Sequence, residues 1–263
     1  MITRHNRLGM SVLGAEGKAT TVWIAVRSGP RGGSATAQGL ARELGRAFSS
    51  HWASVRLESL RTEGREAEFR VRPCPHCGAS LDLTGFPETP QVYCRYCDSI
   101  STSGPSAPTG EEKFHRCDGC GYYSVPKVFS STVVVFALAV VVWWSNRRYY
   151  CRSCMKREAW KTFFKNLPTL VGAPFALVQL ARSYLGGAAR TWPLAGLDAA
   201  NRAGASGKLE RAERTYQEIL TRVPHAAGVH YNRAKAHAQV RDWAGCVAAL
   251  DRVWADCPAT RRR

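Results

Sequence analysis

Eight of the ten cysteines in this chain fall in four Cys-x-x-Cys pairs, the pattern that most directly implies chemistry. Two thiolates three positions apart on a tight turn can bind the same metal ion, and two such turns complete a tetrahedral site of four sulfur ligands. Four pairs therefore predict two zinc ions, neither of which keeps an open coordination position for catalysis. The candidate ligands are Cys74, Cys77, Cys94, Cys97, Cys117, Cys120, Cys151 and Cys154.

The first two pairs resemble a zinc ribbon over about residues 72–100. The sequence reads Cys74-Pro-His-Cys77-Gly78, and after a spacer it reads Tyr93-Cys94-Arg-Tyr-Cys97. In that fold each pair ends a β-hairpin, and Gly78 suits the positive-φ position that follows such a turn. The resemblance implies one structural zinc ion held by these four cysteines.

The third pair has two possible partners. The spacing from Cys97 to Cys117 would also fit a ribbon, but the intervening segment is rich in Ser, Pro, Gly and Thr, which is typical of a flexible linker (residues 101–112). We therefore expect Cys117 and Cys120 to pair forward with the fourth pair, in a possible second ribbon over residues 115–156.

An uncharged stretch of seventeen residues, Val128–Trp144, separates the third pair from the fourth. As one helix it would be a candidate transmembrane segment at the short end of what a bilayer needs. It would then place the two cysteine pairs on opposite sides of the membrane, where they could not share an ion. As a β-hairpin, which its many valines favour, it would bring them together.

A second, weaker apolar stretch covers residues 167–181, and the connector between the two stretches is strongly basic. Basic connectors face the cytoplasm. We therefore expect a membrane-associated protein whose ribbons face a reducing, cytoplasmic compartment, with a wholly cytoplasmic protein as the alternative.

The C-terminal segment shows a 34-residue spacing of similar residues. Ala212 and Cys246 are one such pair, Tyr216 and Leu250 another, and the spacing also relates Ile219 to Val253 and Pro224 to Pro258. This period resembles the tetratricopeptide repeat. The resemblance implies two helix pairs at about 194–205 with 209–222 and 228–240 with 244–255.

In that family the first helices line a groove for an extended protein segment, so the resemblance implies a protein partner. Asn232 and Arg233 lie on the first helix of the second repeat, and we predict that they contact this partner. Because two repeats are few for a free-standing array, self-association through the open end is an alternative.

The N-terminal residues suggest a small α+β unit. We expect strands at 21–27, 52–60 and 66–72 and a helix at about 34–50, in the order β-α-β-β. The loop Gly29–Ser34 is glycine-rich but lacks the Gly-Lys-Ser/Thr ending of a nucleotide-binding loop, so we interpret it as a turn and helix cap.

The expected fold class is a multidomain α+β protein with a small N-terminal βαββ unit, zinc ribbons, apolar membrane-type segments and C-terminal tetratricopeptide-like helices. The predicted divisions are a small domain (1–72), a ribbon (73–100), a linker (101–112), a second ribbon with an apolar insert (113–156, insert 128–144), a basic and apolar segment (157–192) and two helical repeats (193–260).

These features predict a non-catalytic, membrane-associated adaptor, and the arrangement resembles bacterial membrane-associated tetratricopeptide proteins. No catalytic combination of residues stands out, so we do not expect an enzyme. The alternative is a nucleic-acid-binding protein, since the net charge is +17. Against it, residues 74–127 carry four basic and six acidic residues, which suits phosphate contacts poorly.

Overall fold

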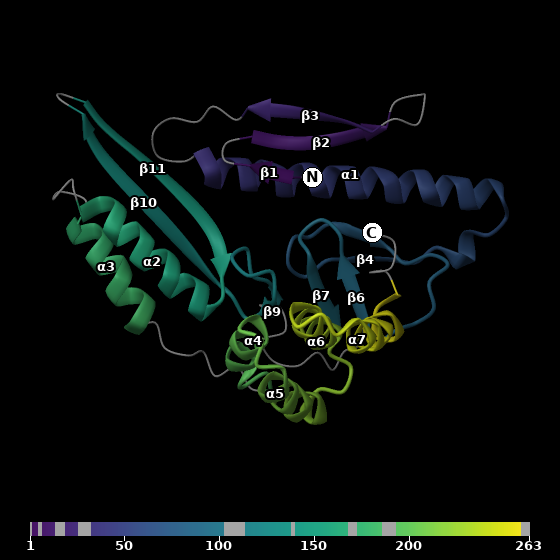
Figure 1. The fold of residues 1–263 in the computed structure, drawn as a ribbon. Helices are drawn as coiled ribbons and strands as arrows, with labels where there is room; N and C mark the ends of the chain where they lie inside the picture. The colour runs from purple at the N-terminus through teal and green to yellow at the C-terminus, as the bar shows by residue number, and fades with distance from the viewer. Residues whose placement is uncertain are drawn as a thin grey trace.

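The computed structural model describes residues 2–4, 7–13, 19–25, 33–102, 114–137, 140–167, 173–185 and 193–258. Within these residues the chain forms seven α-helices and four small antiparallel sheets. The ribbons lie at the centre, with a long helix on one side and the C-terminal helices on the other, and a β-hairpin projects beside two further helices (Figure 1).

The N-terminal part differs from the expected β-α-β-β order. Strands β1 (Ile2–Arg4), β2 (Arg7–Leu13) and β3 (Ala19–Ala25) form one sheet, and a single helix α1 (Gly33–Thr62) follows. The strand predicted at 52–60 is therefore wrong, and residues 66–68 form a short 3₁₀ turn before strand β4 (Val71–Pro73). Residues 29–32 of the glycine-rich loop lie outside the described residues.

The burial pattern of α1 explains why it continues as a helix. Gly45, Ser49, Ala53 and Leu60 are buried at intervals of about one or two helical turns, while the residues between them are mostly exposed. This is a helical period and not the alternation of a strand. Ser49 anchors α1 to the first ribbon, because its hydroxyl accepts the Ser80 N–H at 2.8 Å.

The two ribbons share one sheet. Strand β4 pairs with β5 (Ser80–Asp82), whereas β6 (Gln91–Cys94), β7 (Ser99–Thr102), β8 (His115–Arg116) and β9 (Tyr123–Ser124) form a four-stranded sheet in that order. Ser99 of β7 pairs with His115 of β8, so the sheet continues from one ribbon into the other. Residues 103–112 of the predicted linker lie outside the described residues.

The apolar stretch at 128–144 is a β-hairpin and not a helix. Strands β10 (Lys127–Ala137) and β11 (Val140–Tyr150) pair antiparallel along their whole length, from Lys127 opposite Tyr150 to Ala137 opposite Val140. The predicted transmembrane helix is therefore wrong. The valine-rich sequence accounts for the strand conformation, since β-branched residues fit an extended, pleated backbone.

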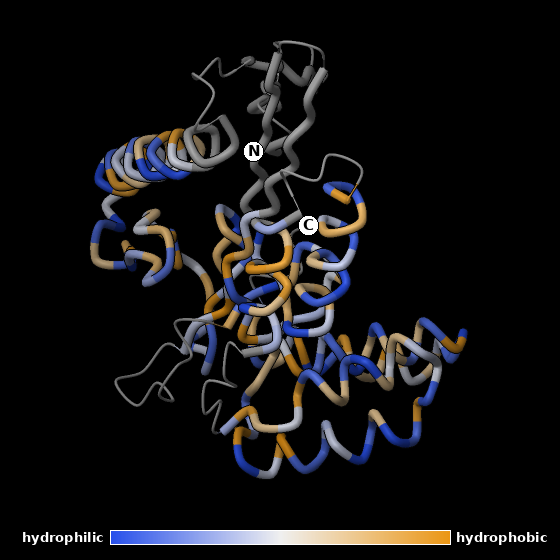
Figure 2. The backbone as a smooth tube through the Cα atoms, turned by 90° about the vertical axis from the view of Figure 1, so that its left-hand side faces the viewer, coloured by the Kyte–Doolittle hydropathy of each residue, from blue (hydrophilic) through white to orange (hydrophobic). Residues whose placement is uncertain are grey.

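The second candidate membrane segment, residues 167–181, is also wrong as a spanning helix in its described part, and its residues 168–172 lie outside the described residues. Helix α2 (Arg152–Asn166) is largely polar, and α3 (Ala173–Leu185) has 13 residues, against about 20 for a bilayer span. Across the described ranges, no helix combines the length and the apolar character that crossing a membrane demands. Hydrophilic residues recur along the helices drawn in Figure 2. The expected fold class is thus corrected to a mixed α/β fold of helices and small sheets, with no membrane-spanning helix in the part of the chain that the structure describes.

Four helices form the C-terminal part, in two successive pairs. They are α4 (Leu197–Ala205) with α5 (Leu209–Arg222) and α6 (Ala227–Gln239) with α7 (Trp243–Asp256). Gly207 and Arg241, 34 residues apart, both have positive φ angles, 75° and 61°, so the same turn joins the helices of each pair. Ala212, Tyr216 and Ile219 are fully buried in α5.

The largest hydrophobic core joins these helices to the ribbon sheet. Tyr93 and Ile100 of the sheet share it with Tyr216 of α5 and Val229 of α6. Gln91 in β6 adds a polar link, because its Oε1 accepts the Ala227 N–H at 2.7 Å. The C-terminal helices are therefore packed on the ribbons.

Candidate metal centres

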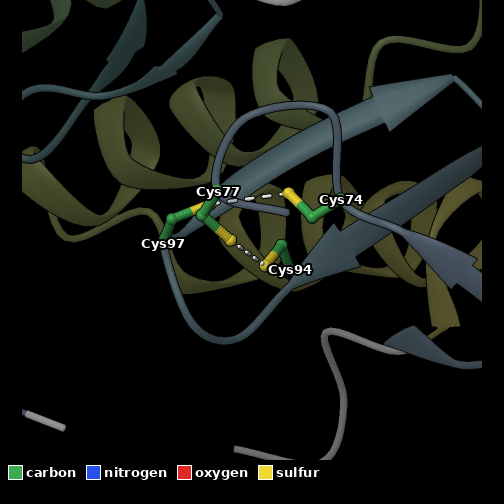
Figure 3. A group of neighbouring side chains, drawn as sticks. All are labelled: Cys74, Cys77, Cys94 and Cys97. Atoms are coloured by element: carbon green, nitrogen blue, oxygen red, sulfur yellow. Dashed lines mark hydrogen bonds between the residues drawn. The ribbon is translucent and has the colours of Figure 1, made fainter. Parts of the chain in front are cut away.

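The first four cysteines meet at the ends of two β-hairpin turns. Cys74 and Cys77 lie in the turn between β4 and β5, whereas Cys94 ends β6 and Cys97 lies in the turn between β6 and β7. Their four sulfur atoms all lie within 4.8 Å of one another, and Figure 3 shows them pointing toward a common centre. The Sγ–Sγ distances are 3.7 Å for Cys74–Cys97 and 3.6 Å for Cys77–Cys94.

These separations match a tetrahedral zinc site. Four sulfur atoms at about 2.3 Å from one ion, at tetrahedral angles, lie about 3.8 Å apart. Gly78 follows the first turn with a φ of 73°, as the ribbon resemblance required, and lets the Gly78 N–H bond back to the Cys74 carbonyl at 2.8 Å. The first tetrad is thus shaped for one metal ion.

The second tetrad joins a hairpin turn to a helix N-terminus. Cys117 and Cys120 lie between β8 and β9, whereas Cys151 and Cys154 lie at the start of α2. All four sulfur atoms again lie within 4.8 Å of one another, with 3.8 Å between Cys120 and Cys151. The forward pairing of the third pair is therefore correct, and it is the β10–β11 hairpin that returns the chain to Cys151.

The electrostatics of both tetrads favour a bound cation. Hydrogen bonds from neighbouring thiols, first that of Cys77, lower the pKa of Cys74 far below its ordinary value, and the thiol of Cys120 has the same effect on Cys117. Hydrogen bonds to Cys74 and Cys117 in turn raise the pKa values of Cys94 and Cys151. Four such thiols cannot all ionise unless a positive charge lies among them, and a zinc ion supplies that charge.

Other groups also stabilise negative sulfur. Ser99 Oγ lies 3.1 Å from Cys97 Sγ and 3.5 Å from Cys74 Sγ, and the Cys151 N–H donates to Cys117 Sγ at 3.2 Å. The N-terminus of α2 directs its partial positive charge toward the second tetrad. The donor set, distances and surroundings fit two zinc ions, each closed by four thiolates.

The two residues predicted to bind a partner serve another purpose. Asn232 is fully buried, and its Oδ1 accepts the Tyr123 N–H while its Nδ2 donates to the Tyr123 carbonyl, both at 2.7 Å. Strand β9 therefore occupies the place where we expected a partner segment. Arg233 pairs with Glu213 of α5 in a two-pronged ion pair, so neither side chain faces an open groove.

Asn201 completes this polar cluster, and the sequence reasoning missed it. Its Nδ2 donates to the Tyr123 carbonyl at 2.9 Å, and its Oδ1 accepts from the Tyr216 hydroxyl at 2.8 Å and from Asn232 at 3.0 Å. We call Asn201, Asn232 and Tyr216 the asparagine clamp. Asn201 lies on α4 and Asn232 on α6, the first helices of the two successive pairs. This equivalent placement was the signal in the sequence that could have identified Asn201.

A lysine ties the clamp region to the second tetrad. Lys235 Nζ donates to the Cys120 carbonyl at 2.5 Å and lies 4.7 Å from the centre of the Tyr122 ring. Helix α6 thus contacts both strand β9 and the metal-binding turn before it. The conformation of the second metal-binding turn therefore depends on the packing of the C-terminal helices.

Comparison with known proteins adds no relative: no protein-family model matches the chain, and neither a curated protein nor a solved structure matches it. The tetratricopeptide resemblance therefore has no support from a family match. What the tetrads support is a zinc-binding protein with two ribbon-like sites.

Proposed function

We propose that this protein is a non-catalytic, zinc-stabilised adaptor that binds a protein partner. The observation that carries the proposal is that each tetrad offers four sulfur ligands to one ion. A zinc ion with four thiolates has no open position for water or substrate and acts as a structural crosslink. No disulfide joins any of the cysteines in the described residues, and the proposal includes a reducing compartment.

Packing of the C-terminal helices supports a role in holding extended protein segments. The asparagine clamp binds the backbone of Tyr123 through its N–H and carbonyl, and a backbone is common to every protein sequence. We propose on this ground that the helices are a tetratricopeptide-like scaffold. Its inner face is occupied by strand β9, so an external partner binds elsewhere on the chain.

Cobalt substitution tests the non-catalytic part. If both ions are held by four thiolates, Co²⁺ gives the intense charge-transfer absorption of tetrahedral sulfur sites, and added azide or imidazole leaves the spectrum unchanged. A spectrum that changes on adding these ligands would reveal an open coordination position and contradict the proposal.

Cross-linking tests the adaptor part. The purified chain is incubated with an extract of its native cell in its zinc-loaded and chelator-treated forms. We expect cross-links to defined proteins that depend on zinc loading. Recovery of the same proteins with the chelated chain would contradict a zinc-supported adaptor.

Nucleic-acid binding remains the second candidate, and one surface favours it. Trp160 and Phe164 of α2 stack with ring centres 5.6 Å apart and are 40% and 60% exposed, and Lys156, Lys161 and Lys165 lie on the same helix. Exposed aromatic rings among basic residues are typical of single-strand binding. A gel shift with a single-stranded oligonucleotide that weakens steeply with salt, and is lost in Trp160→Ala, would favour this candidate.

A further inference from the structure

A cavity of about 820 Å³ separates part of the first ribbon from the C-terminal helices. The ribbon contributes Arg70, Arg72 and the loop between β5 and β6, and the helical part contributes residues 222–225 and Pro258. Its volume lies within the roughly 300–1,000 Å³ of ligand sites. None of the eight candidate zinc ligands lines it.

Much of the cavity wall is apolar and stiff. Phe86, Pro87, Pro90, Pro224 and Pro258 all line it. Proline has a fixed φ angle and no N–H group, so these positions hold their shape and offer no backbone donor to a ligand. A preformed wall reduces the entropy lost when a ligand binds.

The charge of the cavity is positive. Arg70, Arg72 and Arg222 line it, and the one carboxylate in its lining, that of Glu88, lies 3.5 Å from Arg70 Nη1 and has a side chain 93% exposed. Arg70 donates to the carbonyls of Leu83 and Phe86, and Arg222 donates to the Ala195 carbonyl at 3.0 Å. Both guanidinium groups therefore already have backbone carbonyls as partners.

Arg72 is the group that most directly indicates a ligand. Arg72 is partly exposed and lines the cavity, and it forms no ion pair with another described residue, although its Nη1 atom is closed off from solvent. A carboxylate accepts hydrogen bonds from a guanidinium in a strong, often two-pronged geometry. Arg72 lies in β4, two residues before Cys74, and pairs with Leu81 of β5. The ribbon that the first zinc ion crosslinks therefore also positions the guanidinium of Arg72.

We propose that this cavity binds the C-terminal residue of a partner protein, with the α-carboxylate on Arg72 and an apolar side chain against Phe86 and the prolines. A C-terminal Leu or Phe carries its carboxylate and apolar side chain on one carbon atom, which matches a cation beside an apolar wall. An internal Asp or Glu would instead bring polar backbone into that wall. This inference rests on the proposed adaptor function and specifies its partner.

Fluorescence anisotropy with labelled peptides tests it on the full, zinc-loaded chain. The probes are hexapeptides with a Gly-Ser stem ending in Leu, Ile or Phe, each made as the free acid and as the C-terminal amide. We expect at least one acid to bind about tenfold or more tighter than its amide, a difference of about 1.4 kcal/mol. Arg72→Gln should reduce binding of the acid to that of the amide.

Two further variants separate this effect from misfolding and from general charge. Pro87 is exposed and lines the cavity, so Pro87→Asp should fold normally and weaken binding of the acid more than that of the amide, because the new carboxylate repels only the acid. Arg95 lies exposed in the second turn of the same ribbon and does not line the cavity, so Arg95→Gln should bind like the wild type. Zinc content and melting temperature are measured for every variant.

Several results would overturn the inference. They are equal binding of acid and amide, absence of acid-dependent binding for every peptide, and wild-type affinity in a folded Arg72→Gln variant. Equal losses in Arg72→Gln and Arg95→Gln would indicate general charge attraction. If 3-phenylpropionate binds as tightly as the peptides, the cavity is a small-acid site instead. If Arg72→Gln keeps zinc-dependent cross-linking to partners, the cavity assignment alone fails and the adaptor proposal stands.

Discussion

The side chain of Asn232 hydrogen-bonds to both the backbone N–H and the carbonyl of Tyr123, 109 residues earlier in the chain, each at 2.7 Å. Tyr123 belongs to β9, which ends the four-stranded sheet of the two ribbons. The carboxamide therefore replaces the next strand, and the edge of the sheet is closed by a helix. Covering an edge in this way removes a site for unwanted strand pairing.

Removing the clamp should destabilise the protein. Asn232→Ala leaves the N–H of Tyr123 buried without its partner and takes a donor from its carbonyl, and each buried group left unpaired costs roughly 1–3 kcal/mol. Gln239 is exposed near the end of the same helix, so Gln239→Ala is the matched control and should change stability little. Denaturant unfolding of zinc-loaded protein measures both. Equal stability of the two variants would contradict the clamp.

A pair of glycine substitutions tests the contact between α6 and the second ribbon. A Cβ atom on Gly228 would overlap the ring of Phe114 and lie 3.1 Å from Tyr123 Cγ, so Gly228→Ala should cost about 1–3 kcal/mol. Gly39 of α1 has nothing within 4 Å of its Cβ position, so Gly39→Ala should instead stabilise by about 0.5–1 kcal/mol. Thermal melting measures both variants, and a shift of the melting temperature in the same direction for both would contradict the packing described.

Parts of this structure could be predicted because short-range spacing determines them. The Cys-x-x-Cys turns and Gly78 after the first of them depend on a few neighbouring residues. The placement of Cys117 and Cys151 in one tetrad could also be predicted, because the polar linker between Cys97 and Cys117 is a poor sequence for a ribbon hairpin.

The rest depends on contacts that spacing does not reveal. Residues 52–60 were expected to form a strand, yet Ala53 and Leu60 are buried at helical intervals. Asn232 was correctly placed on a first helix, but the occupant of the groove is Tyr123, from the same chain. Only the folded chain shows that the ribbon and the helices share one core.

The two cysteines outside the tetrads should differ in reactivity. Burial raises the pKa of Cys257 to about 12, and its side chain is fully buried, whereas Cys246 is partly exposed. Iodoacetamide on the native, zinc-loaded protein at pH 8 should therefore alkylate Cys246 well before Cys257. Mass spectrometry of the digested protein measures the two rates, and faster modification of Cys257 would contradict this burial.

The same thiol predicts a dependence of stability on pH. The pKa of Cys257 is about 9 when unfolded and about 12 when folded, so between these values the unfolded chain loses a proton that the folded chain keeps. Its contribution should be constant below about pH 9 and fall as the pH rises toward 12. The decline should be shallower in Cys257→Ala than in the wild type, and identical slopes would contradict the assignment.

The second metal centre should control the order of the C-terminal helices. Cys154→Ser removes one ligand of the second tetrad, while Lys235 of α6 bonds to the turn at Cys120. We expect loss of one zinc ion and faster amide hydrogen exchange in β9 and α6. Cys246→Ser, outside both tetrads, should retain both ions and wild-type exchange. Unchanged exchange in Cys154→Ser after loss of zinc would show that the helices pack independently of the metal.

Metal stoichiometry, measured together with the number of free thiols, is the direct test of whether each cysteine tetrad binds one zinc ion. Wild-type protein purified under reducing conditions should hold two zinc ions per chain. Cys94→Ser and Cys154→Ser should each hold one, because each tetrad binds its own ion. Addition of a mercurial reagent should release both ions as eight thiolates react. A wild-type value near zero, with the eight cysteines intact as free thiols or joined in disulfides, would contradict it.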